Sequence, residues 1–130
     1  MSHVHASAPG KAVLSGEYAV LQGAPAICMA VNNRAIVTIK RVQEPWHSVS
    51  AAGYSSGEGR FVSDGSAPEW LQGEEDYQLV DVAWRALGPN SDVGLAIELD
   101  TRAFFDDKSG AKLGLGSSAA LTVALTAALM

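Results

Sequence analysis

The pattern of apolar and polar positions divides the chain into an extended first third, a weakly patterned middle and a strongly patterned last third. Residues 4–42 alternate or run apolar, with many β-branched side chains between 34 and 42, which indicates strands. Pro9-Gly10 breaks the first alternation, and turn signals follow at 22–25 and at 32–33. We therefore expect separate strands over 4–8, 11–21, 26–31 and 34–42, the second of them straight or bent into a pair.

Beyond residue 42 the pattern first fades and then strengthens. Residues 44–73 are rich in Ser and Gly and predict loops with one short strand over 49–51. Apolar residues recur at helical spacing through 76–87, and the alternation from 93 to 99 predicts a strand with one buried face. A second helix follows the glycines near 115. This order of elements predicts an α+β fold, with a mixed β-sheet and helices packed on one face.

Composition places the chain among single globular domains. It has 130 residues, 48% of them apolar and 18% charged, with a net charge of −5, which argues against broad binding to nucleic acid or anionic membranes. Its one cysteine, Cys28, lies in an apolar run and is expected to be a buried free thiol. No basic segment precedes an apolar stretch at the start, and the apolar run 119–130 is shorter than a membrane span, so we expect a cytoplasmic protein.

The strongest chemical signal is a glycine-rich segment that leads into a helix. Gly114 and Gly116 allow the backbone to approach a bulky anion, and the first helical N–H groups point outward without partners. Together with the helix dipole they form a phosphate site, to which Lys112 adds a charge. Ser117 or Ser118 caps the helix, which leaves one hydroxyl for a phosphate or Mg²⁺. The alternative, a tight loop whose serines only cap, stays open on pattern alone.

Two other phosphate motifs fit less well. The Walker pattern requires Gly-Lys followed by Ser or Thr, and the sequence contains no such tripeptide. Residues 114–119 match the dinucleotide fingerprint G-x-G-x-x-A, but the polar residues 106–112 stand where a buried strand is required.

A second segment, residues 7–21, has a Pro-Gly turn followed by Lys11 and Glu17 among apolar residues. On spacing alone, Lys11 extends along the surface and Glu17 faces solvent or pairs with it. The three histidines, His3, His5 and His47, lack metal-ligand spacing with Cys28 and are expected at the surface or in the sheet.

Together the two segments resemble the motifs of the GHMP kinases (galactose, homoserine, mevalonate and phosphomevalonate kinases). Pro-Gly-Lys at 9–11, with Gly-Glu-Tyr-Ala-Val at 16–20, resembles the first motif, and Gly-Leu-Gly-Ser-Ser-Ala-Ala at 114–120 resembles the second, ATP-binding motif. Gly-Glu-Tyr and the lysine at 112 resemble phosphomevalonate kinases, whereas mevalonate kinases usually have Gly-Glu-His. The resemblance implies the N-terminal lobe of these kinases, which is similar to domain 2 of ribosomal protein S5.

The resemblance also implies a reaction and the residues that perform it. The γ-phosphoryl of ATP would pass to phosphomevalonate in isoprenoid precursor synthesis, with Mg²⁺ as a bridging ion. Lys11 and Lys112 would neutralise charge on the transferred group, and Ser117 would bind Mg²⁺. The ATP phosphates would be wrapped by Gly114, Leu115, Gly116, Ser117, Ser118 and Ala119. The acceptor would lie near Ser15, Glu17 and Tyr18.

The sequence departs from the family in its length. GHMP kinases have two lobes, and their third motif and a catalytic aspartate lie beyond the second motif. We therefore expect residues 1–130 to be an N-terminal ATP-binding domain without its C-terminal lobe, with little or no turnover alone. The apolar helix at 121–130 is expected to meet a partner, such as a second copy. Two alternatives stay open, a mevalonate kinase and a non-catalytic domain that binds nucleotide or a partner.

Overall fold

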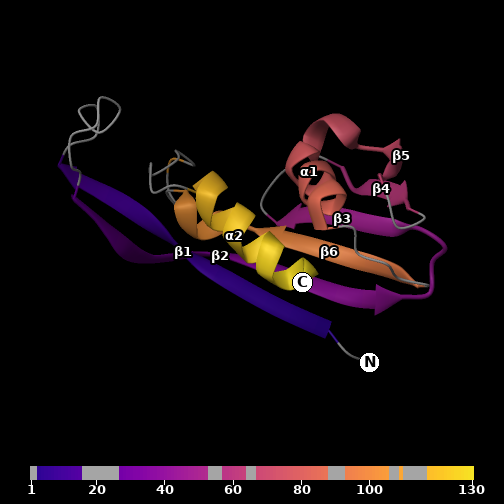
Figure 1. The fold of residues 1–130 in the computed structure, drawn as a ribbon, viewed down its shortest axis with the longest axis horizontal. Helices are drawn as coiled ribbons and strands as arrows, with labels where there is room; N and C mark the ends of the chain where they lie inside the picture. The colour runs from indigo at the N-terminus through magenta and orange to yellow at the C-terminus, as the bar shows by residue number, and fades with distance from the viewer. Residues whose placement is uncertain are drawn as a thin grey trace.

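The chain folds into one mixed sheet and two helices (Figure 1). The computed structural model describes residues 3–15, 27–52, 57–63, 67–87, 93–105, 109 and 117–130. The strands are β1 (His3–Ser15), β2 (Ile27–Val42), β3 (His47–Ala52), β4 (Gly59–Val62), β5 (Glu69–Gln72) and β6 (Gly94–Asp100). The helices are α1 (Gln78–Leu87) and α2 (Ser117–Leu129), with short 3₁₀ turns η2 (Glu74–Asp76) and η3 (Arg102–Phe104). Neither of these helices has the length and apolar character that crossing a membrane requires.

The six strands form one sheet in the order β1-β2-β6-β3-β4-β5. Only β3 and β6 are parallel, and the other neighbouring pairs are antiparallel. Both helices lie on the same face, with α2 over β1 and β2 and α1 over the other end of the sheet (Figure 1). The expected α+β architecture, a mixed sheet with helices on one face, is confirmed.

Buried and exposed side chains alternate along β2, and the buried ones mark the face of the sheet that the helices cover. Ala35, Val37 and Ile39 are buried, while Arg34 and Lys40 on the opposite face are exposed. The register continues the buried row into β6, because Val37 pairs with Leu99 and Ile39 with Ile97. Since side chains alternate between faces of a strand, this register gives the helices one continuous apolar surface.

Alanines bring α2 close to the sheet. Ala120, Ala124 and Ala128 are buried at spacings of four residues and therefore share one side of the helix. The sheet beneath also presents small side chains, Ala8 of β1 and Ala35 of β2, in the same apolar core. Small side chains on both surfaces allow a short distance between helix and strands, so the position of α2 is closely set by β1 and β2.

Aromatic side chains fill the other end of the core under α1. Trp84 and Phe61 are fully buried, with ring centroids 4.8 Å apart in an edge-on arrangement. The indole of Trp84 donates a hydrogen bond to Ser63 Oγ at 3.1 Å, and that of Trp70 donates to Asp81 Oδ1 at 2.9 Å. These bonds satisfy the polar ends of two large side chains and fasten β4 and β5 to α1.

The structure corrects two expectations about local structure and confirms a third. Pro9-Gly10 and Asn32-Asn33 do not end strands, because β1 and β2 run through them with a register shift between Pro9 and Lys11. Residues 44–73 are not mostly loops in the described part of the chain, because they hold β3, β4 and β5. The helix expected over 76–87 is confirmed as α1, with Asp76 in the preceding turn.

Replacement of Trp84 by Ala is expected to lower the free energy of unfolding by about 3–5 kcal/mol, because it removes a fully buried ring and leaves a cavity. The matched control is Val82→Ala on the same helix, where the side chain is 62% exposed and the change should stay within about 0.5 kcal/mol. Urea denaturation followed by circular dichroism measures both variants. Equal losses would show that α1 does not pack as described.

Candidate functional site

The structure describes part of the predicted site. Lys11 and Ser15 lie on β1, and Ser117, Ser118 and Ala119 form the first turn of α2. Lys11 and Ala119 are exposed. The other predicted residues lie outside the described part of the chain: Glu17, Tyr18, Lys112, Gly114, Leu115 and Gly116.

Helix α2, whose first turn is the described part of the second motif, packs on β1 and β2. Figure 1 shows that α2 begins toward the end of the sheet where β1 finishes and β2 starts. That is the end of β1 that carries Lys11 and Ser15. Helix α2 therefore packs on the strand that carries Lys11 and Ser15, although the two segments are about a hundred residues apart in sequence, and β1 and β2 extend beyond its start (Figure 1).

The start of α2 suits an anion. The first N–H groups of any α-helix lack partners within the helix, and the dipole places positive potential there. The first turn of α2 contains no acidic residue that would offset this potential. By contrast, α1 has Asp81 in its first turn. Of these two helices, α2 therefore has the start with the more favourable electrostatic potential for an anion.

Lys11 follows directly on a bulge in the β1–β2 pairing. Pro9 pairs with Arg34, but Lys11 pairs with Ala30, so β2 inserts extra residues opposite Gly10. A bulge interrupts the hydrogen-bonded ladder, bends the strand and changes the direction of nearby side chains. Lys11, which is exposed, thus lies where the edge strand β1 bends, and not in a regularly hydrogen-bonded stretch of the strand.

The same bulge holds the turn η3 in place. The side-chain amide of Asn33 donates a hydrogen bond to the backbone oxygen of Ala103, which joins positions 70 residues apart. The next residue, Phe104, is fully buried in the core. These contacts fix the chain just before residues 106–116, at the bulge beside Lys11. The sequence offers no periodic signal for such a contact.

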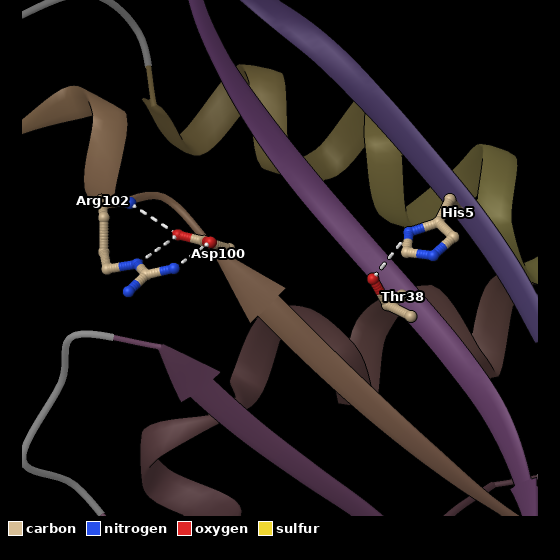
Figure 2. A network of polar contacts seen from close by, with 4 residues as sticks. All are labelled: His5, Thr38, Asp100 and Arg102. Carbon is tan, nitrogen blue, oxygen red and sulfur yellow. Dashed lines mark hydrogen bonds and ion pairs between the residues drawn. The ribbon is translucent and has the colours of Figure 1, made fainter.

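An acid–base pair stabilises η3 from its other side. The Asp100 carboxylate accepts the backbone N–H of Arg102 at 3.0 Å and two guanidinium bonds, from Nε at 3.1 Å and Nη2 at 2.9 Å (Figure 2). Hydrogen bonding from Arg102 holds the pKa of the Asp100 carboxyl below its usual value, against the opposing effect of burial. The pair therefore stays ionised over the neutral range and keeps the turn closed.

The sheet face turned away from the helices is polar. His5 and Thr38 are hydrogen bonded across β1 and β2 at 3.0 Å, and the Arg34 guanidinium donates to Ser7 Oγ at 3.0 Å (Figure 2 shows the first pair). Within the described residues, no three His, Cys, Asp or Glu side chains gather into a group that could hold a metal ion. The side chain of Ser117 lies outside the described part of the structure, so the assignment of Mg²⁺ to it stays a prediction.

Comparison with known proteins relates this geometry to a function. No family model matches the chain. Mevalonate kinase of Methanothermobacter thermautotrophicus is 36% identical over 124 residues, which cover 95% of this chain and 35% of that protein. The mevalonate kinase structure of Methanococcus jannaschii superposes with a TM-score of 0.67 at 21% identity, over 98% of this chain and 39% of the other.

The chain has the fold of a GHMP kinase. It is homologous to mevalonate kinase along nearly its whole length. The GHMP-kinase fold is also shared with Streptococcus pneumoniae phosphomevalonate kinase, solved with phosphomevalonate and AMPPNP, with a TM-score of 0.64 at 21% identity, over 99% of this chain and 36% of that one. The chain spans about a third of the length of the curated relative that it matches. The preference for phosphomevalonate kinase over mevalonate kinase is not confirmed by these similarities.

Replacement of Asn33 by Ala is expected to reduce the free energy of unfolding by about 0.5–1.5 kcal/mol, the usual net value of one hydrogen bond. The neighbouring Asn32→Ala is the matched control, because Asn32 is exposed and should change stability by less than about 0.5 kcal/mol. Chemical denaturation measures both. If the two variants were equally stable, the hydrogen bond from Asn33 to Ala103 would not contribute to stability, contrary to this prediction.

Proposed function

We propose that this chain is the N-terminal, ATP-binding part of a GHMP-family kinase that acts on a mevalonate-derived acceptor. The observation that carries the proposal is the 36% identity to a mevalonate kinase over 95% of the chain, because both motifs lie within that length. The fold supports it because α2, which begins at Ser117, packs on β1, the strand that carries Lys11 (Figure 1).

In this proposal the backbone of residues 114–118 wraps the ATP phosphates. The free N–H groups at the start of α2 face them, and Lys112 adds a cationic charge. The hydroxyl of Ser117 would hold Mg²⁺, which would supply positive charge against the phosphates when bound. Lys11 lies on β1, against which α2 packs, and in this proposal its ammonium neutralises the transferred phosphoryl group.

The proposed acceptor is phosphomevalonate. An oxygen of its phosphate attacks the γ-phosphorus of ATP, the bond to the β-phosphate oxygen breaks, and ADP leaves with the bonding electrons. A phosphate monoester is already anionic at neutral pH and needs no base, since its second pKa is about 6. The requirement is instead for cations to offset repulsion between two anions, which Lys11 and Lys112 supply. Ser15, Glu17 and Tyr18 are proposed to lie near this acceptor.

Mevalonate is the second candidate acceptor, and the identity to a mevalonate kinase favours it. Its hydroxyl must lose a proton during transfer, so this reaction requires a general base that a phosphate acceptor does not. Incubation of the full-length protein with ATP and each acceptor in turn, with ADP release as the readout, distinguishes the two. Release with mevalonate only would overturn the phosphomevalonate assignment, and release with neither would favour a non-catalytic, nucleotide-binding domain.

Lys112→Ala and Ser117→Ala are each expected to weaken binding of ATP with magnesium by about 10–100-fold. This corresponds to the loss of one hydrogen bond to a charged group, about 1.5–3 kcal/mol. Calorimetric titration measures the change. Lys40→Ala is the matched control, because it removes an exposed lysine of β2 and should leave the affinity within about twofold. Unchanged binding in both loop variants would mean that this segment is not a phosphate site.

We further propose that the outer side of α2 associates with a second copy of the chain. Ala119, Val123 and Ala127 are exposed along it, and Val123 has 60% of its surface accessible. An apolar side chain at this exposure favours contact with another apolar surface.

Val123→Lys is expected to lower the average mass in sedimentation equilibrium, because a charge at the centre of an apolar contact costs desolvation. Val82→Lys is the control, since it adds the same charge at a similarly exposed position of α1 and should leave the mass unchanged. A wild-type protein that is a monodisperse monomer, and binds no dye specific for apolar surfaces, would contradict this association.

A further inference from the structure

The buried histidine His47 occupies an unusual position at the start of β3. Only 5% of its surface is exposed. Its ring packs against Phe61 of β4, with centroids 5.1 Å apart, and against Trp84 of α1, with centroids 4.8 Å apart. The sequence prediction that His47 lies in the sheet is correct, but its side chain is enclosed by aromatic groups and not at the surface.

The Nδ1 atom of His47 accepts the backbone N–H of Leu95 at 3.0 Å. The ladder between β3 and β6 begins at the next pair, Ser48 with Ala96, so this side chain extends the pairing of the two strands by one position. A ring nitrogen that accepts a hydrogen bond carries no proton, so the imidazole is neutral with its proton on Nε2. One side chain thus joins β3, β4, β6 and α1.

Protonation would disrupt this arrangement. A second proton on Nδ1 turns the acceptor into a donor that faces another donor, the Leu95 N–H. The ring would also carry a charge in an apolar surrounding, and burial lowers the pKa of His47 below its usual value for this reason.

The charged groups on the surrounding elements pair with one another or are exposed. Arg60 of β4 pairs with Glu58 at 2.9 Å and lies over the Trp46 ring. Asp81 and Arg85 of α1 pair with each other at 2.9 Å. On β6, the exposed Glu98 lies three positions beyond Leu95, and Glu44 before β3 is also exposed. Burial is the cause of the pKa shift of His47, and no carboxylate contributes to it.

We propose that His47 is an acid-sensitive latch between the sheet and α1. The neutral ring holds the first residues of β3 and β6 together beneath Trp84, and uptake of a proton breaks the bond to Leu95 and loosens β3 from β6 and α1 from the sheet. Because the neutral form is favoured in the folded state, this stability is complete above the ordinary histidine pKa, near 6.5, and is lost as the pH falls below it.

The first test is urea denaturation of the chain between pH 5 and pH 7.5. The unfolding equilibrium constant is expected to rise by up to tenfold per pH unit below about 6.5, and His47→Gln, which keeps an acceptor but does not titrate, should abolish this rise. His5→Gln is the control, since His5 is exposed on β1 and its loss should leave the rise in place. This range lies above the usual pKa of Asp81 and Asp100, whose carboxyl pKa values are lowered, so both stay ionised. A rise that persists in His47→Gln would overturn the latch.

A second measurement needs no variant and holds even if His47→Gln fails to fold. In the wild-type protein, nuclear magnetic resonance should show the His47 proton on Nε2 at neutral pH, and protection of the Leu95 amide should fall between pH 7 and pH 5. A proton on Nδ1, or titration at the ordinary histidine pKa, would refute the proposal. Neither outcome depends on the proposed kinase activity.

Discussion

One-sided burial of the sheet is the constraint on which this structure depends. Most large apolar side chains of the strands point to one face, because both helices lie there, and Ile36 of β2 and Leu71 of β5 are exposed exceptions (Figure 1). At one end of that face the residues are small, with Ala8 and Ala35 below and Ala120 and Ala124 on α2. The close fit of these alanines fixes where α2 lies, and therefore where its free N–H groups are presented relative to β1.

The molecule has two parts that serve different purposes. In the first, β1, β2 and α2 carry the residues that we propose to handle ATP and its acceptor. In the second, β3, β4, β5 and α1 are packed around aromatic rings and carry none of the proposed site residues. Strand β6 and the His47 bond to Leu95 connect the two. Strand β6 pairs with β2 on one side and with β3 on the other, so the second part borders the strands of the proposed site through β6.

Sequence patterns predicted the long and strongly periodic elements. The helix around Trp84 and the strand through Ile97 and Leu99 were clear, because each repeats its apolar positions over two or more turns or pleats. Strands β4 and β5 were not predicted, because a strand of four residues has too few alternating positions to be recognised. The positions of Phe61 and Trp70 are set by packing against other parts of the chain. The tether from Asn33 to Ala103 and the enclosure of His47 depend on distant segments, which no local pattern reveals. Much of the candidate site was indicated by motif resemblance, not by periodicity.

The strand order also has a consequence for how the chain assembles during synthesis. The β1–β2 pair and the β3–β4–β5 meander are each made of neighbours in sequence, so each can form as soon as its own residues have left the ribosome. They touch through β6, which is made after both and must enter between them. Until Gly94–Asp100 has emerged, β2 and β3 both present an unpaired edge, and the nascent chain is then most exposed to pairing with a wrong neighbour.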